Sequence, residues 1–331
     1  MMIETILVPI GVVGGLGLMY GFGLAVASKK FHVEIDPRVE QVMEALPGAN
    51  CGACGKPGCA GYAEAVVLED FPINKCAPGG VECIENLSKI MGKTAEIGIR
   101  NVAYIHCKSG GSNNTNLRYE YQGIETCASA VATAQGPNLC SYGCVGFNDC
   151  FVSCEFGAII IDENNNRIID EDKCTACGAC VTACPRNLIE LIPVNKVVRI
   201  DCMSHDFGAV PKQVCGAGHP CIGCAICAKK CPVDAITMVD KLAIIDHDKC
   251  INCGICATSC PTKAIEDQLA GKRKKAVIID EKCIGCTICA RKCPVGAIEG
   301  KVKELHVIDK DKCIGCEICV VKCPKDAIIM K

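Results

Sequence analysis

The sequence of 331 residues contains no tryptophan, and aromatic residues make up only 4% of it. Large aromatic side chains supply much of the buried area in ordinary domains, so we expect a thin aliphatic core in which bound inorganic groups fill part of the interior. The sequence has no P-loop and no strand–glycine-rich–helix motif for dinucleotides. No Ser-His-Asp or Cys-His arrangement stands out either. These absences argue against nucleotide-dependent and nucleophilic enzymes.

Charge gives little indication of a partner. The net charge is −2, with 35 basic and 37 acidic residues interspersed along the chain, so nothing suggests nucleic acid. The one basic run, residues 271–275, is typical of a solvated linker. The carboxylate pair Glu171-Asp172 begins a predicted loop, and we interpret it as capping or solvated rather than catalytic. His106 and His219 lie near cysteines, but we interpret both as ordinary residues.

Cysteine is the residue in excess, with 33 copies. Such a density is typical of disulfide-stapled secreted scaffolds or of metal proteins. The odd count, the spacings of mostly two and three residues and the length of the chain all oppose a disulfide scaffold. Zinc is the stronger alternative, because zinc ribbons also use C-x2-C pairs.

Five segments have the spacing C-x2-C-x2-C-x3-C followed by proline. Three thiolates within seven residues can ligate three irons of one [4Fe–4S] cube, and the fourth cysteine ligates the other cluster of a two-cluster module. Zinc requires no such arrangement. The cysteines of these segments are Cys174, Cys177, Cys180, Cys184, Cys221, Cys224, Cys227, Cys231, Cys250, Cys253, Cys256, Cys260, Cys283, Cys286, Cys289, Cys293, Cys313, Cys316, Cys319 and Cys323.

The motifs are expected to work in pairs, and a sixth, degenerate motif supplies the missing partner. Its cysteines are Cys140, Cys144, Cys150 and Cys154. Gaps of 18 or 19 residues separate the motifs within three pairs, whereas the other gaps are 22 and 36 residues. This spacing predicts modules over 140–184, 221–260 and 283–323. In the second, Cys260 would complete the cluster of the first triplet and Cys231 that of the second.

Two further groups of cysteines lie outside these motifs. The spacing C-x2-C-x4-C-x16-C, in a glycine-rich loop, predicts a first cluster; its cysteines are Cys51, Cys54, Cys59 and Cys76. Zinc is the alternative at this site when it is considered alone. Of the five cysteines that remain, four could hold an eighth cluster: Cys107, Cys127, Cys202 and Cys215. Cys83 is interpreted as a free thiol. Seven [4Fe–4S] clusters are therefore expected, with room for an eighth.

The N-terminus contains an uncharged run of 24 residues, Thr5–Ser28. As a helix this run would be about 36 Å long, enough for a hydrocarbon core of about 30 Å. A cleaved signal peptide is the alternative, but no positive charge precedes the run, and Lys29 and Lys30 follow it. The positive-inside tendency then predicts a single-pass protein of the cell membrane with most of the chain in the cytoplasm. Its dense glycines favour a partner membrane helix.

Short β-branched runs precede most cysteine loops, so each unit is predicted to read strand, loop, short helix, strand. The predicted fold class is α+β: an N-terminal transmembrane helix, a small [4Fe–4S] domain, then tandem two-cluster bacterial ferredoxin-like modules. The predicted domains are an anchor over 1–30, a single-cluster domain over 31–100, a first ferredoxin-like module with flanking cysteine segments over 101–215, a second module over 216–265 and a third over 276–331.

With these motifs in view, the chain resembles the B subunit of the Rnf complex, the membrane ferredoxin:NAD oxidoreductase of bacteria. The resemblance rests on the N-terminal helix, the segment LPGANCGACG at 46–55 and CAPGG at 76–80, followed by ferredoxin repeats. Two additional motif pairs make it similar to the extended form from anaerobes. The cysteines of the 51–76 group match the family's first-cluster ligands, and the repeat cysteines match its ferredoxin ligands.

The resemblance implies a function in electron transfer. The chain would accept electrons from reduced soluble ferredoxin and pass them toward a flavin- and NAD-binding subunit, within an oxidoreductase complex that pumps Na+ or H+. The chain itself would carry electrons only, and its partners would be ferredoxin and the other membrane and flavin-containing subunits. Two alternatives remain: a polyferredoxin that serves another redox enzyme such as a hydrogenase, and a non-redox zinc or interaction module.

Overall fold

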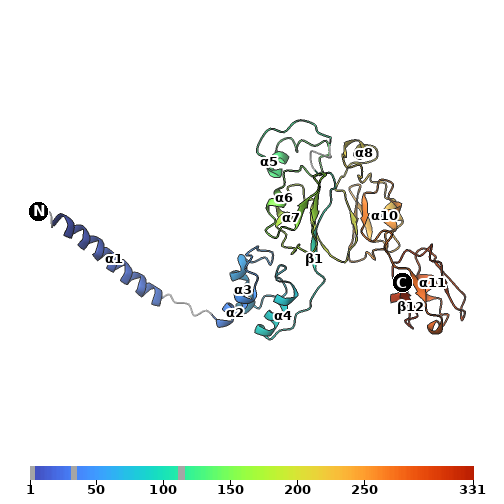
Figure 1. The fold of residues 1–331 in the computed structure, drawn as a ribbon, viewed down its shortest axis with the longest axis horizontal. Helices are drawn as coiled ribbons and strands as arrows, with labels where there is room; N and C mark the ends of the chain where they lie inside the picture. Colours follow the sequence, from blue (N-terminus) through green and yellow to red (C-terminus); the bar gives the residue numbers. More distant parts are fainter. Residues whose placement is uncertain (1–3, 31–35, 111–115) are drawn as a thin grey trace.

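The computed structural model describes residues 4–30, 36–110 and 116–331, with side chains from Val13 onward in the first helix. This helix, α1 (Glu4–Lys30), extends away from the rest of the chain. A small helical unit follows it, then two modules side by side, and a third module that carries the C-terminus (Figure 1).

The helix α1 does not support the predicted membrane span. In the described part of the chain, no helix combines the length and the apolar character needed to cross a membrane.

The small helical unit consists of α2 (Pro37–Ala45), α3 (Gly58–Leu68) and α4 (Gly80–Met91). The helix α2 begins after Asp36, whose carboxylate accepts the backbone N–H of Arg38 at 2.9 Å, and it has proline at its first position. The helix α4 ends at Gly92 in the left-handed conformation, with φ of 63°. The three helices pack around a buried core that includes Tyr62 and Leu87.

Each ferredoxin-like module contains two small antiparallel sheets: a hairpin between its two cysteine motifs, and a pair formed by the strands that flank the module. The hairpins are β2 (Ile159–Ile161) with β3 (Arg167–Ile169), β6 (Ile236–Val239) with β7 (Leu242–Ile245), and β10 (Ile298–Glu299) with β11 (Val307–Ile308). The flanking pairs are β1 (Asn101–Ile105) with β4 (Ile189–Pro193), β5 (Val198–Ile200) with β8 (Ile265–Asp267), and β9 (Ala276–Ile278) with β12 (Ile328–Met330). The strand β5 therefore belongs to the sheet of the second module, although it lies in the region predicted as 101–215.

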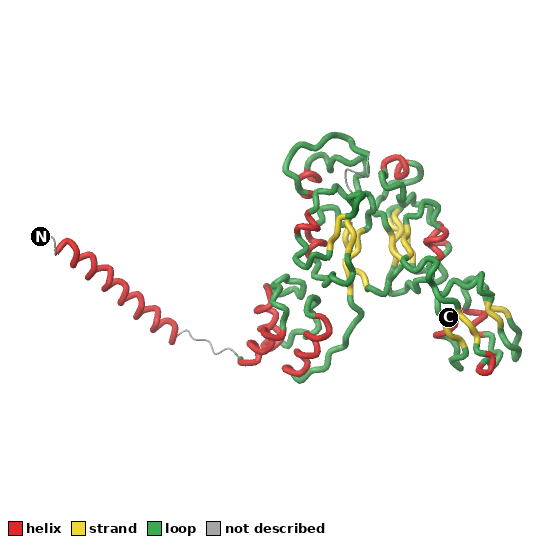
Figure 2. The backbone as a smooth tube through the Cα atoms, viewed as in Figure 1, coloured by secondary structure: helices red, strands yellow, loops and turns green. Residues whose placement is uncertain are grey.

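Short helices follow the cysteine loops and pack in pairs, one pair to a module. They are α6 (Asp149–Val152) with α7 (Ala179–Ala183), α9 (Ile226–Lys229) with α10 (Ile255–Ser259), and α11 (Ile288–Lys292) with α12 (Ile318–Val321). Additional elements are α5 (Cys127–Ala132), α8 (Val210–Val214) and a 3-10 turn at Asp280–Lys282. In the first and second modules the strands lie toward the middle and the short helices on the outer sides (Figure 2). Cysteines and aliphatic residues make up most of each core, and Tyr104 is the aromatic member of the first.

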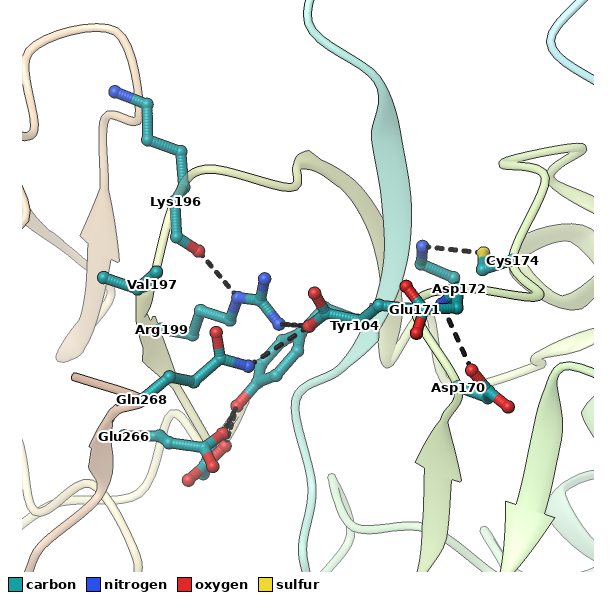
Figure 3. Close-up of polar contacts among 12 residues, drawn as sticks. Tyr104, Asp170, Glu171, Asp172, Cys174, Lys196, Val197, Arg199, Glu266 and Gln268 are labelled. Atoms are coloured by element: carbon teal, nitrogen blue, oxygen red, sulfur yellow. Dashed lines mark hydrogen bonds and ion pairs between the residues drawn. The ribbon is translucent and has the colours of Figure 1, made fainter. Parts of the chain in front are cut away.

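A buried polar cluster joins the first module to the second (Figure 3). The side chain of Arg199, on β5, is 2% exposed and lies 2.6 Å from the carboxylate of Glu171 in the first module. Its guanidinium also lies 4.9 Å from the ring centroid of Tyr104, on β1. The Tyr104 hydroxyl donates to Glu266 at 2.8 Å and also contacts Asp201. Because each of these contacts crosses between modules, the pair forms one body.

Replacing Glu171 with alanine is expected to loosen this interface, because it leaves a buried guanidinium without its carboxylate. The expected cost is about 2–4 kcal/mol, in the range for breaking a buried ion pair from one side. Thermal unfolding of the anaerobically purified chain should show a lower midpoint. The adjacent, exposed Asp172 provides the control, because Asp172→Ala should change stability by less than about 0.5 kcal/mol. Equal unfolding midpoints for the two variants would contradict a stabilising role for the Glu171–Arg199 ion pair at this interface.

The basic run 271–275 is only in part the solvated linker that the sequence predicts: Lys272 and Lys274 are exposed, but Arg273 is not. The side chain of Arg273 is 11% exposed and pairs with Asp267, which is 4% exposed, at 2.5 Å. It also donates to the carbonyl of Asn252 at 2.7 Å, and the Lys275 ammonium donates to the carbonyl of Cys313. A sequestered carboxylate needs a cation beside it, and Arg273 supplies that charge. Arg273 and Lys275 of this run therefore connect the third module to the second.

Candidate iron–sulfur centres

The regular cysteine loops share one backbone conformation. Two residues with positive φ separate the three closely spaced cysteines, so the loop coils around a central space. In the loop from Cys250 to Cys256 they are Asn252, with φ of 55°, and Gly254, with φ of 75°. The corresponding pairs elsewhere are Ala176 and Gly178, Gly223 and Ala225, Gly285 and Thr287, and Gly315 and Glu317. Non-glycine residues pay about 1–2 kcal/mol in this conformation, which is typical of backbone held in place for a functional site.

The fourth cysteine of every motif accepts a hydrogen bond at its sulfur from the backbone N–H four residues later. The donors and distances are Ala158 to Cys154 at 3.4 Å, Leu188 to Cys184 at 3.4 Å, Ala235 to Cys231 at 3.2 Å, Ala264 to Cys260 at 3.4 Å, Ala297 to Cys293 at 3.3 Å, and Ala327 to Cys323 at 3.3 Å. Such bonds favour a thiolate and tune the potential of a cluster bound to it. The degenerate motif has the same geometry at Cys154, although Glu155 replaces its proline.

Three cavities are lined by the cysteine quartets that the cross-ligation pattern predicts. Each contains one triplet and the fourth cysteine of the paired motif. The quartets are Cys154 with Cys174, Cys177 and Cys180; Cys260 with Cys221, Cys224 and Cys227; and Cys293 with Cys313, Cys316 and Cys319. Burial, together with neighbouring thiols that include Cys231, raises the pKa of Cys253, which places Cys231 near the remaining triplet of the second module.

The donor set fits iron–sulfur clusters. Each of these three cavities is lined by four cysteines, which is the ligand number of a [4Fe–4S] cluster. Burial and nearby cysteines raise the pKa of both Cys180 and Cys256 to about 12, so the thiols on their own would be neutral at pH 7. Iron would supply the positive charge that holds them as thiolates, and binding would release protons.

The first module departs from the predicted grouping. The loop from Cys144 to Cys150 has its positive-φ residues at Gly146 and Asn148, and Phe147 stands where the second cysteine would be. The missing thiol comes from Cys127, at the first position of α5, since one cavity is lined by Cys127, Cys144, Cys150 and Cys184. The Asp149 carboxylate accepts the backbone N–H of Cys127 at 2.9 Å and fixes α5 against the loop.

Cys140 consequently lies elsewhere. The structure does not place it with Cys144 and Cys150, but on a separate cavity lined by Cys107, Cys140, Cys202 and Cys215. The sequence predicts Cys140 in one group with Cys144 and Cys150, and Cys127 in another with Cys107, Cys202 and Cys215. In the structure these two cysteines are exchanged between the groups. Aligning the loop on Cys150 and Cys154 would have revealed Phe147 at the second cysteine position, and with it a shortage of one ligand.

The first cluster motif lies in the small helical unit. Cys59 is buried at the start of α3, and Cys54 and Cys76 pack against the same core. The Asn50 side chain accepts the backbone N–H of Cys59 at 2.8 Å, which shapes the glycine-rich loop. Cys83 is buried beside this group, and its hydrogen bond lowers the pKa of Cys76.

The two histidines near cysteines have ordinary partners. His106 is buried, with Nδ1 at 2.7 Å from the carbonyl of Ile200 and Nε2 at 3.1 Å from Glu190. The Nδ1 atom of His219 lies 3.3 Å from the carbonyl of Thr262. These contacts agree with their interpretation as structural residues.

Family models match the same segments. A "4Fe-4S dicluster domain" matches residues 243–299 and 276–330, and another of that description matches 220–264. A "4Fe-4S binding domain" matches 167–190, and a "Putative Fe-S cluster" domain matches 46–78. Fold and site together define an iron–sulfur protein built from tandem ferredoxin-like domains.

Relatives narrow this class to one family. The B subunit of the Na+-translocating ferredoxin:NAD+ oxidoreductase complex of Acetobacterium woodii is 42% identical over 75% of this chain and 74% of its own. The B subunit of an ion-translocating oxidoreductase complex from Methanosarcina acetivorans is 38% identical over 80% of this chain and 99% of its own. The B subunit of the proton-translocating ferredoxin:NAD+ oxidoreductase complex of Clostridium ljungdahlii is 40% identical over 73% and 85%. The chain belongs to the family of B subunits of ion-translocating ferredoxin:NAD oxidoreductase (Rnf) complexes.

Proposed function

We propose that the chain is the iron–sulfur electron-transfer subunit of an ion-translocating ferredoxin:NAD+ oxidoreductase. It takes electrons from reduced ferredoxin and relays them toward a flavin- and NAD-binding partner. The observation that carries this proposal is the set of cysteine quartets, each lining its own cavity, in a chain of this family. [4Fe–4S] clusters bound there would each accept and donate one electron.

The residues of the chain hold and tune these centres. The loops present three sulfurs from one motif and one from its partner. The backbone N–H groups of Ala235 and Ala264, which donate to sulfur at 3.2 and 3.4 Å, stabilise negative charge on the ligands. Buried Cys227 lies near Cys256, so the two sites of the second module are adjacent. Electrons would therefore cross each module over a short distance.

The proposed partners are soluble ferredoxin and the other subunits of the complex. Relatives named as subunits of ion-translocating complexes motivate this assignment and a location at the cytoplasmic side of the cell membrane. The coupled ion is Na+ or H+. A polyferredoxin that serves another redox enzyme is the second candidate, because the C-terminal modules would suit it equally well.

The anaerobically purified chain is expected to contain iron and acid-labile sulfide in equal amounts, about four of each per quartet, with little zinc. It should be reduced by ferredoxin and should copurify with flavin-containing membrane partners. Stoichiometric zinc with little iron would exclude the electron-transfer function. A cluster-loaded chain that never associates with flavin-containing partners would favour the second candidate.

A further inference from the structure

The cavity lined by Cys107, Cys140, Cys202 and Cys215 is built from four separate segments of the chain. Cys107 follows β1, Cys202 follows β5 and Cys215 directly follows α8, whereas Cys140 comes from the loop between α5 and α6. Figure 1 shows α5 and α8 at the same end of the first two modules. No C-x2-C repeat brings these cysteines together, so the tertiary fold alone assembles the quartet.

Backbone N–H groups donate hydrogen bonds to sulfurs of this quartet, as they do in the regular motifs. The N–H of Cys144 donates to the sulfur of Cys107 at 3.4 Å, and the N–H of Ser204 donates to the sulfur of Cys202 at 3.4 Å. Burial raises the pKa of Cys202 to about 12. A set of four such thiols is the ligand set of a cubane cluster. The cavities and the predicted cluster groups together then account for every cysteine except Cys83 in sets of four.

We propose that Cys107, Cys140, Cys202 and Cys215 bind an additional [4Fe–4S] cluster, and that this cluster is the electron relay between the first and second modules. The relay role rests on the proposed electron-transfer function, whereas the metal site rests on the quartet alone.

The quartet lies directly between a site of each module. Toward the first module, Cys144 donates its N–H to Cys107 and has its own side chain on the neighbouring cavity. Toward the second, His219 and Pro220 line the quartet's cavity, and the next residue, Cys221, lines the following one. The Cys221 backbone N–H also contacts the sulfur of Cys202. The quartet is thus in contact with one cluster site of the first module and one of the second.

The path continues from the second module into the third. Arg273 donates to the carbonyl of Asn252, in a cysteine loop of the second module, and Lys275 donates to the carbonyl of Cys313, in a cysteine loop of the third. One short segment of the chain therefore joins these two loops.

The first test is the iron and sulfide content of the purified full chain. Eight sites predict about 32 irons per wild-type chain, against about 28 without the additional site. Cys215→Ala and Cys140→Ala should each lose about four irons. A wild-type value of about 28, or variants that retain the full content, would overturn the site. The wild-type value decides even if a variant fails to fold.

The second test is the time course of reduction by reduced ferredoxin supplied in excess over the clusters of the chain. In the wild type all clusters should be reduced in one rapid phase. In Cys215→Ala only the clusters on one side of the gap should be reduced rapidly, with the electron paramagnetic resonance signals of the remaining clusters still present after dithionite. If a variant that lacks four irons were still reduced in a single rapid phase, the metal site would be supported but its role as the electron relay would be contradicted. A wild type that ferredoxin does not reduce would count against the proposed function and the relay, while the iron content would still decide the site.

Discussion

The substitution Cys231→Ala is expected to remove the cluster ligated mainly by Cys250, Cys253 and Cys256, and to leave the cluster of its own triplet intact. The reason is the crossed arrangement of the module, in which Cys260 lies on the cavity of the first triplet and Cys231 lies near Cys253. Iron content should fall by about four per chain. Because the lost site adjoins the third module, electron transfer into that module should stop.

The matched variant is Cys224→Ala, which should remove the neighbouring cluster instead. Electron paramagnetic resonance of the reduced proteins distinguishes the two, since each variant should lose a different signal and keep the other. Loss of the same signal in both variants would show that each motif ligates its own cluster, and the crossed scheme would be wrong.

The modules could be predicted because the ligands of a cluster repeat at fixed spacing and the gaps between motifs differ. The loop conformation follows from the same spacing, so the pairing of regular motifs needed no tertiary information. The exchange of Cys127 and Cys140 could not be found this way. Both cysteines lie outside any regular triplet, and only the position of Phe147 in the loop shows which ligand is missing.

The contacts between modules could not be predicted from the sequence either. Tyr104 and Glu266 are 162 residues apart, and neither lies in a motif, yet their hydrogen bond helps to join two modules. The basic run 271–275 reads locally as a solvated linker, because nothing in its own composition indicates the buried carboxylate of Asp267. Charge patterns predict burial poorly when the partner is supplied by a distant strand or loop.

The second large effect is expected from Gly254→Ala. Gly254 adopts a φ of 75°, but the backbone alone does not require glycine, because Thr287 adopts a φ of 63° at the corresponding position of another loop. A Cβ atom at 254 would instead collide with Asp267 and would lie 2.8 Å from Nη1 of Arg273. The alanine must therefore separate this buried ion pair, at an expected cost of about 3–5 kcal/mol.

Gly178→Ala is the matched control for this substitution. Gly178 occupies the same position in the first module with a φ of 80°, and a Cβ atom there would meet only Leu191, at 4.0 Å. Gly178→Ala should lower the stability only by the cost of a non-glycine residue in the left-handed conformation, about 1–2 kcal/mol. The temperature at which the anaerobic protein loses its iron–sulfur absorbance should fall much further for Gly254→Ala. If both variants fell equally, left-handed strain alone would explain the glycine, and the ion pair between Asp267 and Arg273 would contribute nothing measurable to holding the third module.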